Sequence, residues 1–296
     1  MSGNSGRIAA RFAGLRKQGR GALIPFLEAF DPDRETSMAI LRGMPAAGAD
    51  LIEIGVPFTN PAADGPTIQR VGQRALLAGG TLEGVLGMMQ EFRRADDTTP
   101  VVLMGYLNPI LAYGADRFCR DAAESGVDGV IVVDMPAEES DELAPHFEGA
   151  GLDLIRLVAP TTDDARLPLV LEGAGGFVYH VAIAGITGTR SAAAEDLMLA
   201  IPRVRAHTTL PIAIGFGIRS PEQAAHAVQV ADAAVVASVL IETLAASLDD
   251  QGCAGPQTVD LVLDQVRGAW QQRYRRSASA PSRPEMAILR AGASTT

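Results

Sequence analysis

The sequence predicts an α/β protein that folds as a single-domain (β/α)8 TIM barrel. Short apolar segments alternate along the chain with longer amphipathic segments. The apolar segments are rich in Val, Ile and Leu and lack a period of two, which is typical of parallel strands that are covered on both faces. Three helical segments run into a glycine just before the next strand, in AAGAD, ESGVD and GAGLD, as helix C-termini commonly do.

The expected elements follow one another in strand–helix order. The strands are Ala22–Leu27, Asp50–Ile54, Pro100–Met104, Gly129–Val133, Leu154–Val158, Phe177–Val181, Pro211–Gly215 and Ala233–Ala237. The helices between them are Arg34–Ala47, Leu82–Phe92, Ala115–Ser125, Glu139–Ala150, Asp163–Glu172, Glu195–Ala206 and Pro221–Val230. This alternation indicates a barrel. A doubly wound open sheet is the alternative, but no GxGxxG motif follows the first strand.

Composition limits the classes of function. The chain has 296 residues, 47% apolar and 20% charged, with a net charge of −10 and a pI of about 4.9. No clustered basic face is expected, which disfavours nucleic acid as a partner. The two cysteines, Cys119 and Cys253, form no CxxC motif, and no two histidines have the spacing of metal ligands. Neither a metal nor another cofactor is therefore expected.

The barrel is expected to occupy most of the chain. Residues 1–19 are expected to form an N-terminal helical segment, residues 20–274 the (β/α)8 barrel catalytic domain, and residues 275–296 a disordered tail rich in Ser, Ala, Pro and Arg. The N-terminal residues lack the apolar stretch of a signal peptide, and no apolar run reaches the ~20 residues that span a bilayer. The sequence therefore predicts a cytoplasmic protein without a membrane segment.

Two carboxylic acids stand out in LIEIGVPFTNPAADGPT, an otherwise apolar, turn-rich segment. Glu53 lies one residue from the end of the second strand and is expected to point into the barrel near its C-terminal end, where barrel enzymes have their active sites. Burial would raise the pKa of its carboxyl group towards the range useful for acid–base catalysis. The alternatives are structural: Glu53 paired with a buried Arg or Lys, and Asp64 as the cap of a helix that begins near Gly65.

Long connections and glycines also mark the C-terminal ends of the strands. The connections from Gly55 to about Leu82 and from Ala182 to Ala194 are long enough to suggest functional loops. Glycine-containing segments follow the sixth and seventh strands, and Ala237-Ser238 opens a helix after the eighth. Backbone N–H groups at these three strand ends are expected to converge on a phosphate group. Each glycine taken alone could also be an ordinary turn residue.

Six segments carry a family resemblance. They are IEIGVPFTNPAADGPTIQ, VLMGYLNPI, VDGVIVVDMPAEES, LVAPTT, GFVYHVAIAGITGTR and LPIAIGFGIRSPEQA, spread in order over roughly residues 20–270. Together they resemble the tryptophan synthase alpha chain family. The resemblance implies the same barrel and a retro-aldol cleavage of indole-3-glycerol phosphate to indole and D-glyceraldehyde 3-phosphate in tryptophan biosynthesis. It also implies a PLP-dependent tryptophan synthase beta chain as partner, in an alpha2beta2 heterotetramer.

The resemblance further implies roles for individual residues. Glu53 would protonate C3 of the indole and assist loss of the side-chain hydroxyl proton, and Asp64 would accept the indole N–H and stabilise the cationic nitrogen. The remaining implied positions are an apolar wall around the indole (Phe26, Met104, Ile131, Val133, Leu157), a tyrosine near the catalytic acid (Tyr179), a loop threonine that orients Asp64 (Thr187) and phosphate-binding positions (Gly188, Gly217, Ala237, Ser238).

The sequence departs from the family pattern at several positions. Asn60 stands where an Asp usually forms a salt bridge with the beta chain, which predicts weak coupling and keeps open a stand-alone lyase or a specialised paralogue. Glu28 would add a third carboxylate near the barrel mouth, and Phe30 stands where glycine is usual. Ala237 replaces a phosphate-site glycine, and Arg156 replaces an apolar residue or Pro. A non-catalytic barrel that binds a beta-like partner, and a different phosphate-binding isomerase or synthase, are the remaining alternatives.

Overall fold

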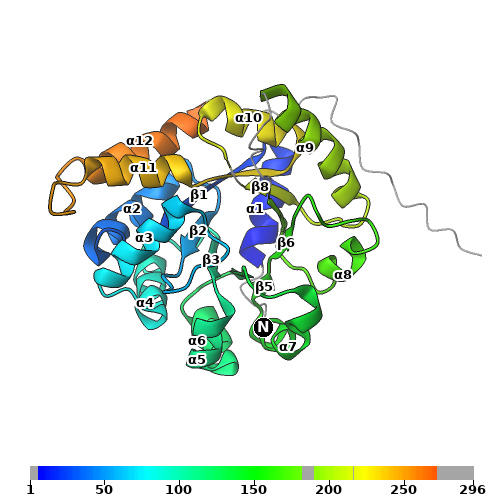
Figure 1. Ribbon diagram of the computed structural model, residues 1–296, viewed down its shortest axis with the longest axis horizontal. Helices are drawn as coiled ribbons and strands as arrows, with labels where there is room; N and C mark the ends of the chain where they lie inside the picture. Colours follow the sequence, from blue (N-terminus) through cyan, green and yellow to red (C-terminus); the bar gives the residue numbers. More distant parts are fainter. Residues whose placement is uncertain (1–5, 182–189, 216, 272–296) are drawn as a thin grey trace, which may run out of the picture.

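The computed structural model shows a ring of parallel strands surrounded by helices (Figure 1), and it describes residues 6–181, 190–215 and 217–271. The strands are β1 (Ala22–Glu28), β2 (Ile52–Gly55), β3 (Val101–Gly105), β4 (Gly129–Val132), β5 (Asp153–Leu154), β6 (Arg156–Val158), β7 (Val178–Val181), β8 (Ile212–Gly215) and β9 (Ala233–Val236). Their order in the sheet is β5-β4-β3-β2-β1-β9-β8-β7-β6. Only Ile155 separates β5 from β6, so the two ends of the sheet meet along one interrupted strand. The predicted (β/α)8 barrel is confirmed.

Helices surround the ring and close one of its ends. They are α1 (Gly6–Lys17), α2 (Arg34–Ala47), α3 (Pro66–Leu77), α4 (Leu82–Arg93), α5 (Leu107–Tyr113), α6 (Ala115–Glu124), the 3-10 helix η1 (Ala137–Glu142), α7 (Ala144–Ala150), α8 (Leu167–Leu171), α9 (Arg190–Arg205), α10 (Pro221–Val230), α11 (Ser238–Ser247) and α12 (Thr258–Gln271).

Local sequence signals account for several helix ends. Asp33 caps α2 by accepting a hydrogen bond from the backbone N–H of Thr36, and Thr81 and Ser220 cap α4 and α10 in the same way. Helix α2 ends at Gly48 with φ of 112°, a left-handed conformation that glycine adopts without steric cost. The boundaries predicted for α2 and α10 therefore agree with the structure.

Two predicted helices are divided or shortened in the structure, and one observed helix was not predicted. The helix expected over Glu139–Ala150 is divided into η1 and α7, because Pro145 lacks the backbone N–H that would continue a hydrogen-bonded helix through this point. The helix expected over Asp163–Glu172 is only the short α8, since Asp163 instead accepts the backbone N–H of Arg166 ahead of it. Helix α5 was not expected from the sequence.

Helix α1 closes the N-terminal end of the barrel. Its apolar residues Ile8, Phe12 and Leu15 are buried in one cluster with inward-facing strand residues that include Ile24 and Phe177. The rings of Phe12 and Phe177 lie 6.0 Å apart, a contact distance for tilted aromatic pairs. In Figure 1, α1 lies across the centre of the ring. The opposite, C-terminal end is left to form a site.

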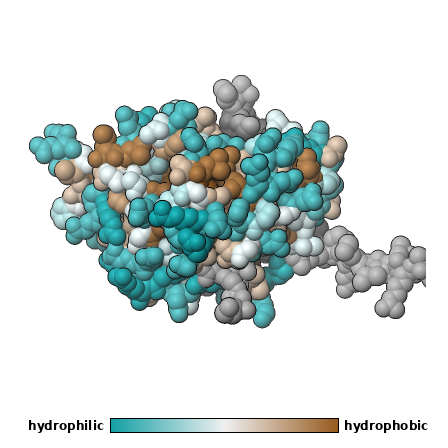
Figure 2. Space-filling view, turned by 90° about the horizontal axis from the view of Figure 1, so that it is seen from below, coloured by the Kyte–Doolittle hydropathy of each residue, from teal (hydrophilic) through white to brown (hydrophobic). Residues whose placement is uncertain are grey.

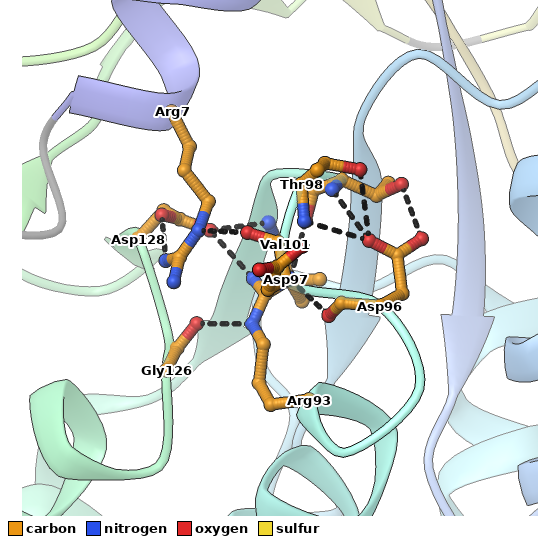
Figure 3. Close-up of polar contacts among 9 residues, drawn as sticks. Arg7, Arg93, Asp96, Asp97, Thr98, Val101, Gly126 and Asp128 are labelled. Carbon is orange, nitrogen blue, oxygen red and sulfur yellow. Dashed lines mark hydrogen bonds and ion pairs between the residues drawn. The ribbon is translucent and has the colours of Figure 1, made fainter.

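A buried ionic cluster ties α1 to the barrel (Figure 3). Asp128, just before β4, is fully buried and accepts bonds from Arg7 of α1 and Arg93 of α4, both at 2.8 Å. It also accepts the backbone N–H of Val101 at the start of β3, at 2.8 Å. Arg93 in turn donates to the carbonyl of Gly126. One carboxylate thus joins two helices and two strands.

The outer surface is dominated by polar side chains. The face in Figure 2 is mostly hydrophilic and carries separate hydrophobic patches. The most exposed large apolar side chains of the described part are Leu77 and Leu199, at 84% and 76%. Across the described ranges, no helix combines the length and the apolarity that crossing a membrane requires.

We predict that Asp128→Ala lowers the free energy of unfolding by about 3 kcal/mol, because it leaves two partly buried guanidinium groups without this counter-charge. Urea denaturation would measure the change. Asp250→Ala is the matched control: this aspartate is exposed in the turn before α12, and its loss should change stability by less than about 0.5 kcal/mol. Equal effects of the two substitutions would contradict the proposed importance of the cluster.

Candidate active site

A cleft lies at the C-terminal ends of β1, β2 and β3. Its walls include Glu28, Asp64, Met104 and Tyr106, and its cavity volume is small, about 10 Å3. A larger open hollow of about 650 Å3 lies beside α1 at the opposite end. The arginines Arg7 and Arg20 that line this hollow are already paired with buried aspartates. We place the site in the smaller cleft, because it combines acids with apolar walls at the end where barrels have active sites.

Glu53 is a buried acid without a counter-charge. It lies in β2, in register with Phe26 of β1 and Val102 of β3, and is 1% exposed. Its Oε2 forms no hydrogen bond with any described residue, and no arginine or lysine in the described ranges pairs with it. Burial, and to a lesser extent the charge of Asp64, raise the pKa of Glu53 to about 8. The structural alternative, a Glu53 ion pair, is therefore wrong for the described part of the chain.

Asp64 is held by a tyrosine hydroxyl. Tyr106 donates a hydrogen bond of 2.9 Å to Asp64 Oδ2 and accepts one of 3.0 Å from the backbone N–H of Ala63. The N-cap of α3 is Gly65, with no side-chain capping bond, so the alternative role of Asp64 as helix cap is wrong. Burial raises the pKa of Asp64, and the Tyr106 hydrogen bond opposes this shift.

Tyr106 is a site residue that the sequence analysis did not single out. It directly follows β3, it is 4% exposed, and its ring packs against Phe58 with centroids 5.1 Å apart. A hydroxyl-bearing residue at the C-terminal end of a barrel strand is the signal that would have identified it. Its contact with Asp64 depends on the path of the loop after β2, which sequence periodicity does not predict.

The predicted apolar wall is brought together by two clusters that share Met104. One cluster, at the mouth, contains Phe26, Met104 and Ala237 with residues of α3 and α11. The other fills the barrel interior, and the predicted residues in it are Ile131, Val133, Leu157 and Tyr179. These clusters supply apolar surface on both sides of the acids.

Tyr179 lies close enough to Glu53 for the two side chains to interact electrostatically. The charge of Glu53, together with the larger effect of burial, raises the pKa of Tyr179 well above its usual value. Its hydroxyl lies against Gly215 of β8, where a Cβ would come within 1.9 Å of the oxygen. A side chain at position 215 would displace the tyrosine.

The predicted phosphate positions are described only in part. Thr187 and Gly188 lie outside the described residues. Gly217 follows β8 with φ of 76°, and Ser238 is the first residue of α11, after the adjacent strand β9. Ala237 precedes this helix without a side-chain cap, so the first N–H groups of α11 have no capping partner there. Phosphate binding at these positions stays a prediction.

Three residues that depart from the family pattern, Asn60, Arg156 and Phe30, lie in different surroundings. Asn60 is exposed on the loop before α3. Arg156 is 6% exposed and donates to Ser140 Oγ at 2.7 Å. Phe30 has φ of 67° and is buried, with its ring against Gly84 of α4. None of these three side chains is among those that line the cleft.

Comparisons with known proteins agree on one family. The model of the family described as "Tryptophan synthase alpha chain" matches residues 12–262. The chain is 65% identical over 260 residues to the tryptophan synthase alpha chain of Acidiphilium cryptum, covering 88% of this chain and 94% of that one. It is also 65% identical over 260 residues to the tryptophan synthase alpha chain of Gluconacetobacter diazotrophicus, covering 88% of this chain and 95% of that one. The crystal structure of tryptophan synthase subunit alpha from Legionella pneumophila superposes with a TM-score of 0.82 at 34% identity, covering 90% of this chain and 97% of that one.

We predict that Glu53→Gln changes the pH dependence of stability. The folded-state pKa of about 8 exceeds the ~4.3 of an exposed glutamate. Between these values the folded protein keeps a proton that the unfolded chain releases, so the free energy of unfolding of the wild type falls as pH rises, by about 1.4 kcal/mol per pH unit. Because glutamine does not titrate, the variant lacks this decrease of the free energy of unfolding with pH.

The stability of the variant relative to wild type should therefore rise by about 2–3 kcal/mol between about pH 5 and about pH 7, measured by urea denaturation at each pH. The control is Glu148→Gln, which makes the same substitution at an exposed position on α7. A pH-independent difference for Glu53→Gln would contradict a neutral, buried Glu53.

Proposed function

The chain belongs to the tryptophan synthase alpha chain family, and we propose that the site at its barrel mouth, with Asp64 in the cleft wall and Glu53 buried in β2, cleaves indole-3-glycerol phosphate to indole and D-glyceraldehyde 3-phosphate. As a member of this family the protein is a lyase of tryptophan biosynthesis. The observation that carries the assignment of the site is the buried carboxyl group of Glu53, which is 1% exposed and has no counter-charge in the described ranges, and whose pKa is raised by burial and by the charge of Asp64. An acid with a pKa of about 8 holds a proton at neutral pH and can transfer it within an apolar site.

The reaction requires a proton at C3 of the indole ring before the carbon–carbon bond can break. Glu53 donates this proton, C3 becomes tetrahedral, and positive charge develops on the ring nitrogen. Asp64 accepts the N–H of the ring and stabilises that charge as a carboxylate. The hydrogen bond from Tyr106 favours the ionised form of Asp64 and orients it.

The second proton transfer restores the acid. The carboxylate of Glu53 takes the proton of the hydroxyl group on the carbon next to the ring, and the bond from this carbon to C3 breaks. Its electrons return to the ring and leave indole, which keeps the proton at C3, and an aldehyde. Two carboxyl groups in different surroundings thus take two roles, a neutral proton donor and a charged stabiliser.

The binding of the substrate would be divided between the two sides of the mouth. Phe26, Met104 and Ile131 would enclose the ring, while N–H groups near Gly217 and at the start of α11 would hold the phosphate, together with Gly188. Thr187 would orient Asp64. The support for this division is the grouping of the apolar residues in two clusters around Met104.

The proposed partner is a PLP-dependent tryptophan synthase beta chain in an alpha2beta2 heterotetramer. Asn60 is exposed on the loop that also carries Asp64, so a partner that contacts this loop would influence the catalytic aspartate. A stand-alone lyase remains the second candidate, because Asn60 lacks the charge for a salt bridge. We also propose a cytoplasmic location, which suits the free thiols of Cys119 and Cys253.

Glu53→Gln should lower kcat for indole release from indole-3-glycerol phosphate by more than about 10⁴-fold, because one residue serves both proton transfers. Asp64→Asn should lower kcat by about 10²–10³-fold through loss of charge stabilisation. Indole is quantified directly, and Glu148→Gln serves as the control with unchanged rate. A wild type that releases no indole yet binds a beta chain would instead support the non-catalytic partner-binding barrel.

Asn60→Asp should increase the activation of indole release by a purified beta chain by about tenfold, because a charge-assisted contact replaces a neutral one. The ratio of rates with and without the beta chain is measured for both proteins, and Thr59→Ser, at the exposed neighbouring position, is the control. Strong activation of the wild type, unchanged in Asn60→Asp, would reject weak coupling and the stand-alone alternative.

A further inference from the structure

Glu28 lies in the cleft but takes no part in the reaction described above. It is the last residue of β1, it is 5% exposed, and it lines the same cleft as Asp64 and Tyr106. In the described ranges, nothing forms a hydrogen bond or ion pair with its carboxyl group. Arg74 of α3, the nearby cation, is already bound to both oxygens of Asp31 at 2.8 and 3.0 Å. Because this nearly buried carboxyl group lines the cleft and has no protein partner in the described ranges, it is available to form hydrogen bonds with a ligand there.

One glycine makes room for this carboxyl group, and a second lies in ordinary contact distance of it. Gly55, the register partner of Glu28 on β2, would place a Cβ within 2.1 Å of Glu28 Oε2. Gly72 of α3 lies on the other side, where a Cβ would be 3.8 Å from Oε1. The carboxyl group therefore sits above the end of β2, on the mouth side of Glu53, which lies two residues earlier on the same strand.

The order of the strands places Glu28 along the path of the substrate. Strand β1 lies between β2, which carries Glu53, and β9, which leads into Ser238. In the proposed function, C3 of the ring is at Glu53 and the phosphate is at Gly217 and Ser238. The chain that connects ring and phosphate must then cross the end of β1, where Glu28 is located.

We propose that Glu28 is a further substrate-binding residue, whose carboxyl group forms a hydrogen bond with the hydroxyl on the middle carbon of the glyceryl chain. This inference rests on the proposed function. The other polar groups of the substrate already have partners there: the ring N–H at Asp64, the hydroxyl next to the ring at Glu53, and the phosphate at backbone N–H groups. The middle hydroxyl remains, and Glu28 is the unpartnered polar group of the cleft wall.

The electrostatics of the cleft suit this contact. Burial, and then the charges of Asp64 and Asp31, raise the pKa of Glu28 well above its usual value. A neutral carboxyl group can donate to the hydroxyl and accept from it, and it adds no negative charge beside Asp64. Among the described residues, no group of three or more His, Cys, Asp or Glu side chains is placed to hold a metal ion.

The test compares two ligands that differ in the hydroxyl groups. Dissociation constants are measured by calorimetry for indole-3-glycerol phosphate and for indole-3-propanol phosphate, whose chain has no hydroxyl. All measurements use the Glu53→Gln background, in which the substrate is not consumed. Glu28→Met removes the hydrogen-bonding group at similar length, and Glu28→Gln keeps it.

Glu28→Met should weaken the binding of the glycerol compound by about tenfold and that of the propanol compound by less than about twofold, while Glu28→Gln stays within about threefold of the parent for both. Equal weakening for both ligands would show a structural role and overturn the inference, as would no change for either. Failure of the proposed function would appear separately, as a wild type that releases no indole. A parent that binds neither ligand would overturn both.

Discussion

Burial of the Glu53 carboxyl group is the constraint on which the rest of the site depends. A glutamate in contact with water is ionised at neutral pH and has no proton to give. Glu53 is 1% exposed because β2 is enclosed by β1 and β3 and because α1 closes the far end of the barrel. The apolar packing of α1 against the inner strand residues thus bears directly on the chemistry at the mouth, since water that entered from below would lower the pKa of Glu53.

The buried acids at the two ends of the barrel differ in how completely their hydrogen bonds are satisfied. At the N-terminal end, Asp128 is bound by two arginines and a backbone N–H. At the C-terminal end, Glu53 Oε2 lacks a hydrogen-bond partner in the described structure, and Asp64 has the single side-chain hydrogen bond from Tyr106. A satisfied network stabilises the fold, whereas an unsatisfied acid costs stability and keeps its bonding capacity for a ligand. The barrel tolerates the unsatisfied Glu53 because the stability contributed by the Asp128 network and by the apolar core offsets its cost.

The sequence predicted the barrel and its strands because buried parallel strands leave a strong signal in short Val/Ile/Leu-rich runs. It predicted Glu53 for a related reason, since an acid within such a run must be buried. Helix α5 was missed because Asn108-Pro109 is a typical turn pair, yet Pro109 falls in the first turn of this helix, where its missing N–H is tolerated. The link between Tyr106 and Asp64 spans 42 positions and depends on the loop after β2, so no local pattern contains it.

The contacts of Phe30 and Asp31, just after β1, hold Glu28 in position at the end of this strand. Phe30 occupies the left-handed region with φ of 67°, which costs a non-glycine residue about 1–2 kcal/mol. Burial of its ring against α4 contributes about 1.5–3 kcal/mol, enough to offset this cost, and its N–H donates to Ser37 Oγ of α2. Asp31, the next residue, is bound to Arg74 of α3. The end of β1 is therefore fixed to three helices, and this anchoring holds Glu28 over Gly55, where a flexible strand end would let an unpartnered carboxyl group turn out into water.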